Sequence, residues 1–298
     1  MSLQVRWLAS APTSCLHAVD AQLSGRALVD DALRDAISAP AERLAQLMVA
    51  AGTERQLFMR HALPLSAGMD LNRLLAEVVL RKTIGGERTA VVLDDFSNCF
   101  GELRRAYQRV RGDVVQQLEI RSQPLRQLWD ARGTGLVGGV ARATEAGLIP
   151  DAVEVVAVDP ATGGGGGAHL LYNSLRIEAV LANPLDALPE TARIAWLVSQ
   201  LNLDCPSFQG TLAPLRAAQC GALAMIPTTL FAAEDVELAR LDPATTELAV
   251  THWAGDPSAP HCDAAATART LLDWWNVYQS SRPAWGVALA ALDQMLAA

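Results

Sequence analysis

The sequence predicts an α+β fold that is predominantly helical, with a small central mixed sheet packed by helices and an all-helical C-terminal third. Apolar residues recur at spacings of three and four over most of the chain, whereas short β-branched runs occur only in the middle. After Leu203 the pattern is helical throughout. We therefore expect residues 1–203 to form an α+β core with N-terminal helices. Residues 204–298 should form a helical region packed on that core, either as a separate unit or within a single domain.

The composition is typical of a globular protein. Of the 298 residues, 51% are hydrophobic and 19% are charged. A chain of this length buries about 75% of the surface that it exposes when unfolded, so it needs no disulfide framework. The five cysteines are scattered and never form a CxxC pair, which indicates reduced thiols. Disordered, collagen-like and disulfide-framework proteins are therefore excluded.

The lack of a recognisable signal peptide favours a cytoplasmic protein, and the charge limits its partners. The chain has no run of about 20 apolar residues, so we expect no membrane partner. The first residues lack the apolar region of a signal peptide, and the predicted location is cytoplasmic. The net charge is −8, and residues 204–298 hold ten acidic residues against four arginines. We expect no nucleic-acid partner for so acidic a region.

The first half of the chain is expected to be mainly helical. Three apolar stripes at helical spacing predict helices over residues 44–51, 71–79 and 103–118. Asp70 is the predicted N-cap of the second helix. A further helix begins after Pro124 and continues into a glycine-rich stretch.

Short β-branched runs predict the strands of the sheet. They are Thr89–Leu93 and Val153–Val158, with His169–Tyr172 and Leu175–Leu181 as two further candidates. The last of these is ambiguous with a helix. Asp94 and Asp95 follow the first run, where carboxylates could bind a hard cation. Capping of a helix near Cys99 by Asp95 or Ser97 explains the same residues without a metal.

The remaining elements are predicted to be helices separated by prolines and loops. The first begins at Pro189 and Glu190, with an apolar face that includes Leu197. The others cover Leu212–Met225, Thr228–Leu241, Pro243–Trp253, Asp263–Tyr278 and Trp285–Leu296.

Five consecutive glycines, Gly163–Gly167, predict a flexible connection between two strands. A phosphate-binding loop would need a lysine followed by serine or threonine, or a GxGxxG turn that opens a helix. Neither pattern occurs at these glycines. We therefore predict no nucleotide cofactor here, and the sequence gives no sign of another cofactor.

The segment from Ala168 to Asn183 carries the densest mixture of functional side chains. As one extended strand, it would align Tyr172, Arg176 and Glu178 on one face. If a turn at Asn173 and Ser174 splits it, His169 and Glu178 would face each other across a hairpin. Both arrangements predict His169 and Glu178 as proton-transfer residues, and Tyr172, Asn173 and Arg176 as ligand-binding residues. The non-functional alternative is an ion pair between Arg176 and Glu178 on a solvated face of the sheet.

The order of elements in this region is similar to the central region of zinc metallopeptidases. A strand, a glycine-rich loop, one or two strands and a helix opened by proline follow one another. In that family the edge strand aligns the peptide, and the helix carries HExxH, with two zinc-binding imidazoles and a general base. Here the helix reads ARIAWLVSQL, with Trp196 and Gln200 at the imidazole spacing. The resemblance therefore implies a related core without zinc catalysis.

Other histidines and cysteines do not show the spacing of a zinc site, so no metal is predicted. Two groups are close in sequence, namely His252 with His261, Cys262 and Asp263, and Cys15 with His17. Neither group has CxxC or HxxxH spacing, and isolated residues of these types usually serve in packing.

Two functions follow from these observations. The first is a soluble, intracellular, non-catalytic protein that acts by binding a small molecule or protein partner, or by assembly, including as a homo-oligomer. The alternative is a hydrolase-like enzyme for a small polar or peptide substrate, in which Arg176 anchors an anion and Glu178 or His169 transfers a proton. Convergence of these three side chains on one pocket would favour the enzyme.

Overall fold

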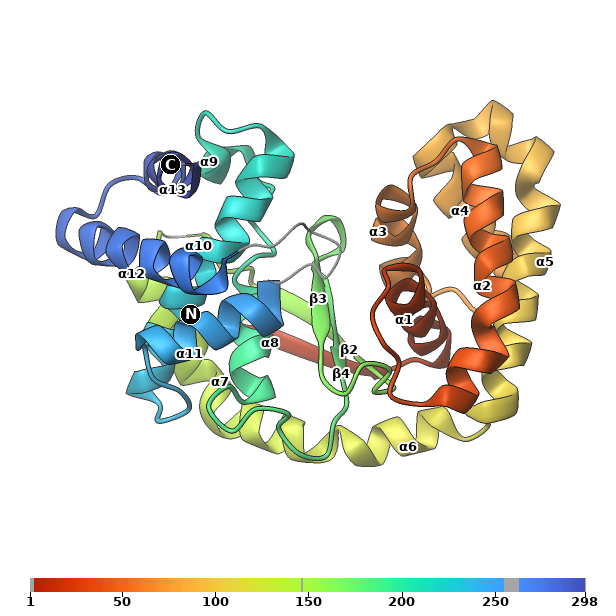
Figure 1. The fold of residues 1–298 in the computed structure, drawn as a ribbon, viewed down its shortest axis with the longest axis horizontal. Helices are drawn as coiled ribbons and strands as arrows, with labels where there is room; N and C mark the ends of the chain where they lie inside the picture. Colours follow the sequence, from red (N-terminus) through yellow and green to blue (C-terminus); the bar gives the residue numbers. More distant parts are fainter. Residues whose placement is uncertain (1–2, 146, 255–262, 298) are drawn as a thin grey trace.

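A computed structural model describes residues 3–145, 147–254 and 263–297. A small sheet lies between two groups of helices, one formed by the N-terminal part of the chain and one by the C-terminal part (Figure 1). The fold is α+β and mainly helical, as the sequence predicts. In the described ranges, none of the helices combines the length and the apolar character that a membrane span requires.

The sheet has four strands in the order β1-β2-β4-β3. Strands β1 (Gln4–Ala9), β2 (Ala152–Val158) and β4 (Ser174–Glu178) are parallel, and β3 (Gly166–His169) is antiparallel to β4. In the register of β2 and β4, Val155 lies beside Leu175 and Val158 beside Glu178. Because the central strands β2 and β4 are mostly buried, helices must cover both faces of the sheet.

The N-terminal helices cover one face of the sheet and share one apolar core. Phe58, Phe96 and Phe100 are buried in it, and the ring centroids of Phe58 and Phe96 are 5.4 Å apart. The helices are α1 (Ala11–Leu23), α2 (Asp31–Ala51), α3 (Arg55–Leu65), α4 (Asn72–Ile84), α5 (Gly86–Val110) and α6 (Val114–Arg121).

The C-terminal helices share a second core with the opposite face of the sheet. Val155, Leu175 and Ile177 contribute to this core from the strands. Trp196 and Trp253 also belong to it, with ring centroids 5.5 Å apart, although one precedes and the other follows Leu203. The predicted boundary at that residue stays a prediction. The elements are α7 (Gln123–Ala143), α8 (Glu190–Val198), α9 (Pro206–Gln209), α10 (Pro214–Asp235), α11 (Pro243–Ala249), a π-helical turn (Val250–Ala254), α12 (Ala264–Ser281) and α13 (Trp285–Ala297).

The predicted strand Thr89–Leu93 is wrong, because this segment belongs to α5. Its buried residues, including Thr89, Leu93 and Phe96, follow a helical spacing, whereas Val91 is 83% exposed. Asp95 and Ser97 therefore lie inside a helix and cap none. Asp94 is exposed and forms an ion pair with Arg73 of α4.

Four other element predictions require correction. The sequence pattern predicts no strand at the position of β1. Asp70 is not a cap, because α4 begins after Leu71. The helix predicted over 103–118 is interrupted at Arg111, whose guanidinium binds Asp30 and Asp159 at 2.6 and 2.8 Å. The two helices predicted on either side of Pro227 form the single helix α10, because burial of the surrounding residues outweighs the roughly 3 kcal/mol that an interior proline costs.

Candidate functional site

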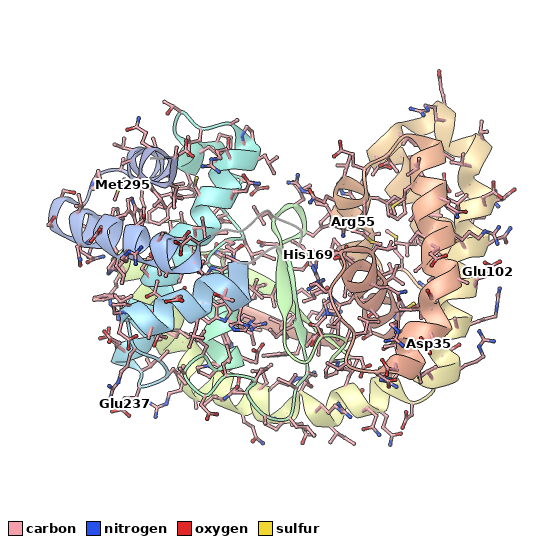
Figure 2. All side chains as sticks on the ribbon, in the orientation of Figure 1. Asp35, Arg55, Glu102, His169, Glu237 and Met295 are labelled. Atoms are coloured by element: carbon pink, nitrogen blue, oxygen red, sulfur yellow. The ribbon has the colours of Figure 1, made fainter. Side chains whose placement is uncertain are left out.

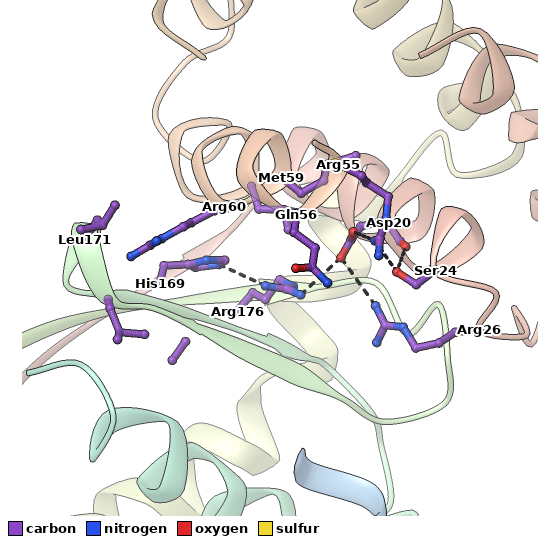
Figure 3. A pocket seen from close by; sticks show the side chains of 13 residues that line it. Asp20, Ser24, Arg26, Arg55, Gln56, Met59, Arg60, His169, Leu171 and Arg176 are labelled. Atoms are coloured by element: carbon purple, nitrogen blue, oxygen red, sulfur yellow. Dashed lines mark hydrogen bonds and ion pairs between the residues drawn. The ribbon is translucent and has the colours of Figure 1, made fainter. Parts of the chain in front are cut away.

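A cavity of about 360 Å³ lies between α1, α3 and the β3–β4 hairpin, and Arg55 of α3 and His169 of β3 both line it (Figure 2). Arg55, Met59 and Arg60 enter it from α3, and Asp20 from α1, while His169 and Arg176 form its floor (Figure 3). The other lining residues are Ser24, Arg26, Gln56, Leu63, Ala168, Leu170 and Leu171. The pocket thus carries four arginines and one carboxylate in a protein whose net charge is −8.

The hairpin turn brings the polar residues of the two strands together. Leu170–Tyr172 form a single 3-10 turn, and Asn173 takes the left-handed conformation with φ of 50°. His169 then lies opposite Ser174, and Gly167 opposite Arg176. Because side chains alternate between the faces of a strand, His169, Arg176 and Glu178 all lie on the face that α1 covers.

Gly163–Gly165 lie in the connection between β2 and β3, as predicted, whereas Gly166 and Gly167 belong to β3 itself. Close packing requires glycine at several of these positions. A Cβ on Gly167 would lie 2.5 Å from Nη1 of Arg176, and one on Gly164 would lie 2.3 Å from Pro184. The N–H of Gly164 also donates to Glu178 at 2.6 Å. The absence of side chains therefore makes room for the Arg176 guanidinium and brings backbone donors to Glu178.

Glu178 is fully buried and is surrounded by hydrogen-bond donors. Its carboxylate accepts from the N–H groups of Ala161, Thr162 and Gly164, from the Thr162 hydroxyl and from His17 Nε2, at 2.6–3.2 Å. Burial alone would raise the pKa of Glu178, but the hydrogen bonds from His17 and Thr162 hold it at about 2. Glu178 is therefore an ionised anchor for the loop of residues 161–164.

His17 links Glu178 to Arg176. Arg176 Nε lies 3.1 Å from His17 Nδ1. A guanidinium can only donate, so Nδ1 accepts and the imidazole proton resides on Nε2, which donates to Glu178 at 2.7 Å. Burial lowers the pKa of His17 despite the neighbouring carboxylate. The imidazole is therefore neutral and fixed in one tautomer.

Arg176 is buried and extends to the floor of the pocket. Burial lowers its pKa while Asp20 opposes that shift, and a guanidinium stays charged in proteins. Its Nη1 lies 3.4 Å from Nε2 of His169. Burial and the charge of Arg176 hold the pKa of His169 well below its usual value, so this imidazole is neutral as well. The Glu178–His17 pair thus orients Arg176 from the side away from the cavity. His169 contacts Arg176 at the floor of the pocket.

The guanidinium groups of the pocket have more donors than their protein partners use. Asp20 binds Arg55 at 2.7 Å, but it lies 3.7 Å from Arg26 and 3.8 Å from Arg176, beyond hydrogen-bond distance. Arg60 is exposed and has no hydrogen-bond or ion-pair partner among the described residues. Since each guanidinium carries five N–H donors, several donors face the cavity unpaired.

Two of the five predicted site residues line the pocket, namely His169 and Arg176. Glu178 lies behind Arg176 and does not reach the cavity. The extended alignment of Tyr172 with Arg176 and Glu178 is wrong, because Tyr172 belongs to the turn and its hydroxyl lies 2.6 Å from His61 Nδ1. Asn173 also serves the turn, and its amide donates to the carbonyl of Ala152 at 3.0 Å.

The predicted hairpin exists, but its pairing differs from the expected one. His169 pairs with Ser174 rather than with Glu178, whose N–H donates to Gly165. The expected solvated ion pair between Arg176 and Glu178 is replaced by a buried contact through His17.

Sequence reasoning missed the pocket residues that come from α1, from the loop after it and from α3. Asp20, Arg26, Arg55 and Arg60 lie more than 100 positions before the hairpin. They stand in no recognised motif, and only the tertiary fold brings them to Arg176. In the sequence His17 stands near Cys15, and no spacing rule connects it with Glu178.

The helix compared with the metallopeptidase zinc helix is α8, and its side chains serve in packing. Trp196 Nε1 donates to the carbonyl of Ala222 at 2.8 Å, and Gln200 donates to the carbonyl of Trp196 at 3.0 Å. In the part of the chain that the structure describes, no three His, Cys, Asp or Glu side chains are placed to hold a metal ion. His261 and Cys262 lie outside the described residues.

Comparison of the chain with protein-family models, with curated proteins and with solved structures gives no match.

Proposed function

We propose that this protein binds a small anionic molecule in the arginine-lined pocket, without catalysing its conversion. One observation carries this proposal: among the described residues, four guanidinium groups surround the cavity, and Asp20, the single carboxylate that lines it there, hydrogen-bonds through its side chain only to Arg55. The unused donors match a carboxylate or phosphate, which arginine binds through two parallel hydrogen bonds.

The shape of the pocket limits the ligand. A cavity of about 360 Å³ is near the lower end for small-molecule sites. Met59, Leu63, Leu170 and Leu171 give part of its wall an apolar surface. The proposed ligand therefore combines an anionic group with a short apolar part.

Calorimetric titration of the protein with citrate and with inorganic phosphate tests the proposal. Arg60→Gln removes a guanidinium that has no partner in the described part of the chain, so it should weaken binding about tenfold, the value of one charge-assisted hydrogen bond. Arg132→Gln, an exposed arginine of α7, makes the same charge change away from the pocket and should bind as the wild type does. Binding should also weaken with added salt. Failure of both anions to bind, or equal losses in the two variants, would refute the proposal.

A hydrolase-like enzyme for a small polar or peptide substrate is the alternative proposal. The observation that favours it is His169, a neutral imidazole at the wall of the pocket and beside an anion-binding arginine. Glu178 takes no part in this version, since it lies outside the cavity. Turnover of ester or peptide substrates that is lost in His169→Gln would favour the enzyme over the binding protein.

The cytoplasmic location and the homo-oligomer remain predictions from the sequence. Cell fractionation and sedimentation analysis would test them.

A further inference from the structure

Strand β3 has a free edge beside the arginine pocket. Residues Gly166–His169 pair with β4 on one side, and no strand in the described ranges pairs with the other side. Gly166, Gly167 and Ala168 are half-buried, so the edge is accessible. Figure 1 shows β3 on the side of the sheet that faces the space between the two groups of helices.

The hydrogen bonds of the hairpin show which backbone groups of this edge are unused. The N–H of Glu178 donates to the carbonyl of Gly165 at 2.8 Å. In an antiparallel pair, every second residue pair exchanges hydrogen bonds. Gly167 and His169 therefore point their backbone groups toward β4. The N–H and C=O groups of Gly166 and Ala168 point away from it and can pair with another strand.

The pocket lies at the end of this edge. Ala168, His169, Leu170 and Leu171 line it, and the chain leaves the sheet in the turn after His169. The Arg176 guanidinium lies beside Gly167 in the middle of β3, and the pocket extends from there to the turn after His169. A strand added along β3 would therefore run beside the guanidinium groups. An extended peptide that ends there would carry its terminal carboxylate into the pocket, where the charge is complementary.

We propose that the anionic ligand is the C-terminal end of an extended peptide. Its backbone pairs with the free groups of Gly166 and Ala168, and its carboxylate lies among Arg26, Arg55, Arg60 and Arg176. Strand addition supplies affinity through main-chain hydrogen bonds, and the pocket supplies specificity for a free C-terminus. This inference rests on the proposed function, because the same guanidinium groups bind the charge.

Calorimetry with wild-type protein and a set of matched peptides tests the inference. The probe is an N-acetylated hexapeptide of alternating valine and threonine with a free C-terminal carboxylate. It should bind at least tenfold more tightly than N-acetylvaline, which has the same carboxylate and no strand to add. The C-terminal amide of the hexapeptide should lose at least tenfold in affinity.

N-methylation of the peptide tests the backbone pairing without changing the protein. Methyl groups on every second amide nitrogen should abolish the gain over N-acetylvaline in one register and leave it nearly intact in the other, because alternate amides face β3. In hydrogen exchange, the amides of Gly166 and Ala168 should become protected in the complex, whereas those of Gly167 and His169 are protected already.

The outcomes separate the two proposals. If N-acetylvaline and citrate bind but the hexapeptide binds no more tightly, or if both methylated registers bind alike, the pocket takes small anions only and the peptide inference is wrong. If none of these anions binds, the proposed function fails and the peptide inference fails with it.

Discussion

The buried carboxylate of Glu178 offers the sharpest test of how this site is built. Glu178→Gln keeps the size of the side chain but replaces one acceptor oxygen with a donor NH2. Oε1 accepts from His17, Ala161 and Thr162, and Oε2 accepts from Gly164. In either amide orientation the new NH2 group faces at least one N–H, and the negative charge opposite these donors is lost. We expect the loop of residues 161–164 and the position of His17 to be destabilised.

The size of the effect follows from the pKa of Glu178. A decrease from 4.5 to about 2 corresponds to about 3 kcal/mol of stability at neutral pH. Because the folded-state pKa is the lower one, this stabilisation is complete above pH 4.5 and is lost as the pH falls toward 2. The difference between wild type and variant should therefore shrink from about 3 kcal/mol at pH 7 to about 1 kcal/mol at pH 3.

Thermal unfolding followed by circular dichroism measures this difference. About 3 kcal/mol should lower the Tm at pH 7 by about 6–12 °C in a protein of this size. Glu154→Gln is the matched control: Glu154 lies on the neighbouring strand β2, is partly exposed and is 3.6 Å from Arg6. A surface pair of this kind contributes about 0–1 kcal/mol. An unchanged Tm in Glu178→Gln, or a loss equally large at pH 3 and pH 7, would refute the reasoning.

Two further predictions concern packing around the sheet, and chemical denaturation measures both. Trp196→Ala and Leu197→Ala should each destabilise the protein by about 3 kcal/mol or more, because both side chains are buried in the C-terminal core; an unchanged midpoint in both would mean that α8 is not a core helix. Gly167→Ala should cost about 1–3 kcal/mol, because its Cβ would meet the Arg176 guanidinium. Gly86→Ala, at the start of α5, meets no atom within 4 Å and should be close to neutral; equal effects of the two alanines would contradict the packing argument.

The predictions that failed share one physical origin. The run over residues 89–93 is rich in β-branched residues, yet it forms a helix because the buried positions that follow it continue at helical spacing on the N-terminal core. Pro227 is a helix breaker in local terms, yet α10 continues through it because its neighbours are buried on several sides. Packing with distant segments outweighed local preference in both segments.

The candidate site was likewise predicted only in part from local sequence. The sequence singled out the segment that contains His169 and Arg176, because several functional side-chain types are concentrated there. The sequence could not show that Arg176 lines the pocket whereas Glu178 lies behind it, because the two residues differ by two positions and share a face of β4. That distinction depends on α1, which places His17 between them.

Local patterns determined the fold class, most helices, the central strands and the hairpin segment, because periodic burial and glycine placement act within a few residues of the chain. Tertiary structure alone decided that arginines from α3 and from the loop after α1 converge on that hairpin. The charge of a pocket is the sum of the charges of side chains that folding brings together. Because these residues are far apart in the sequence, their spacing does not predict that charge.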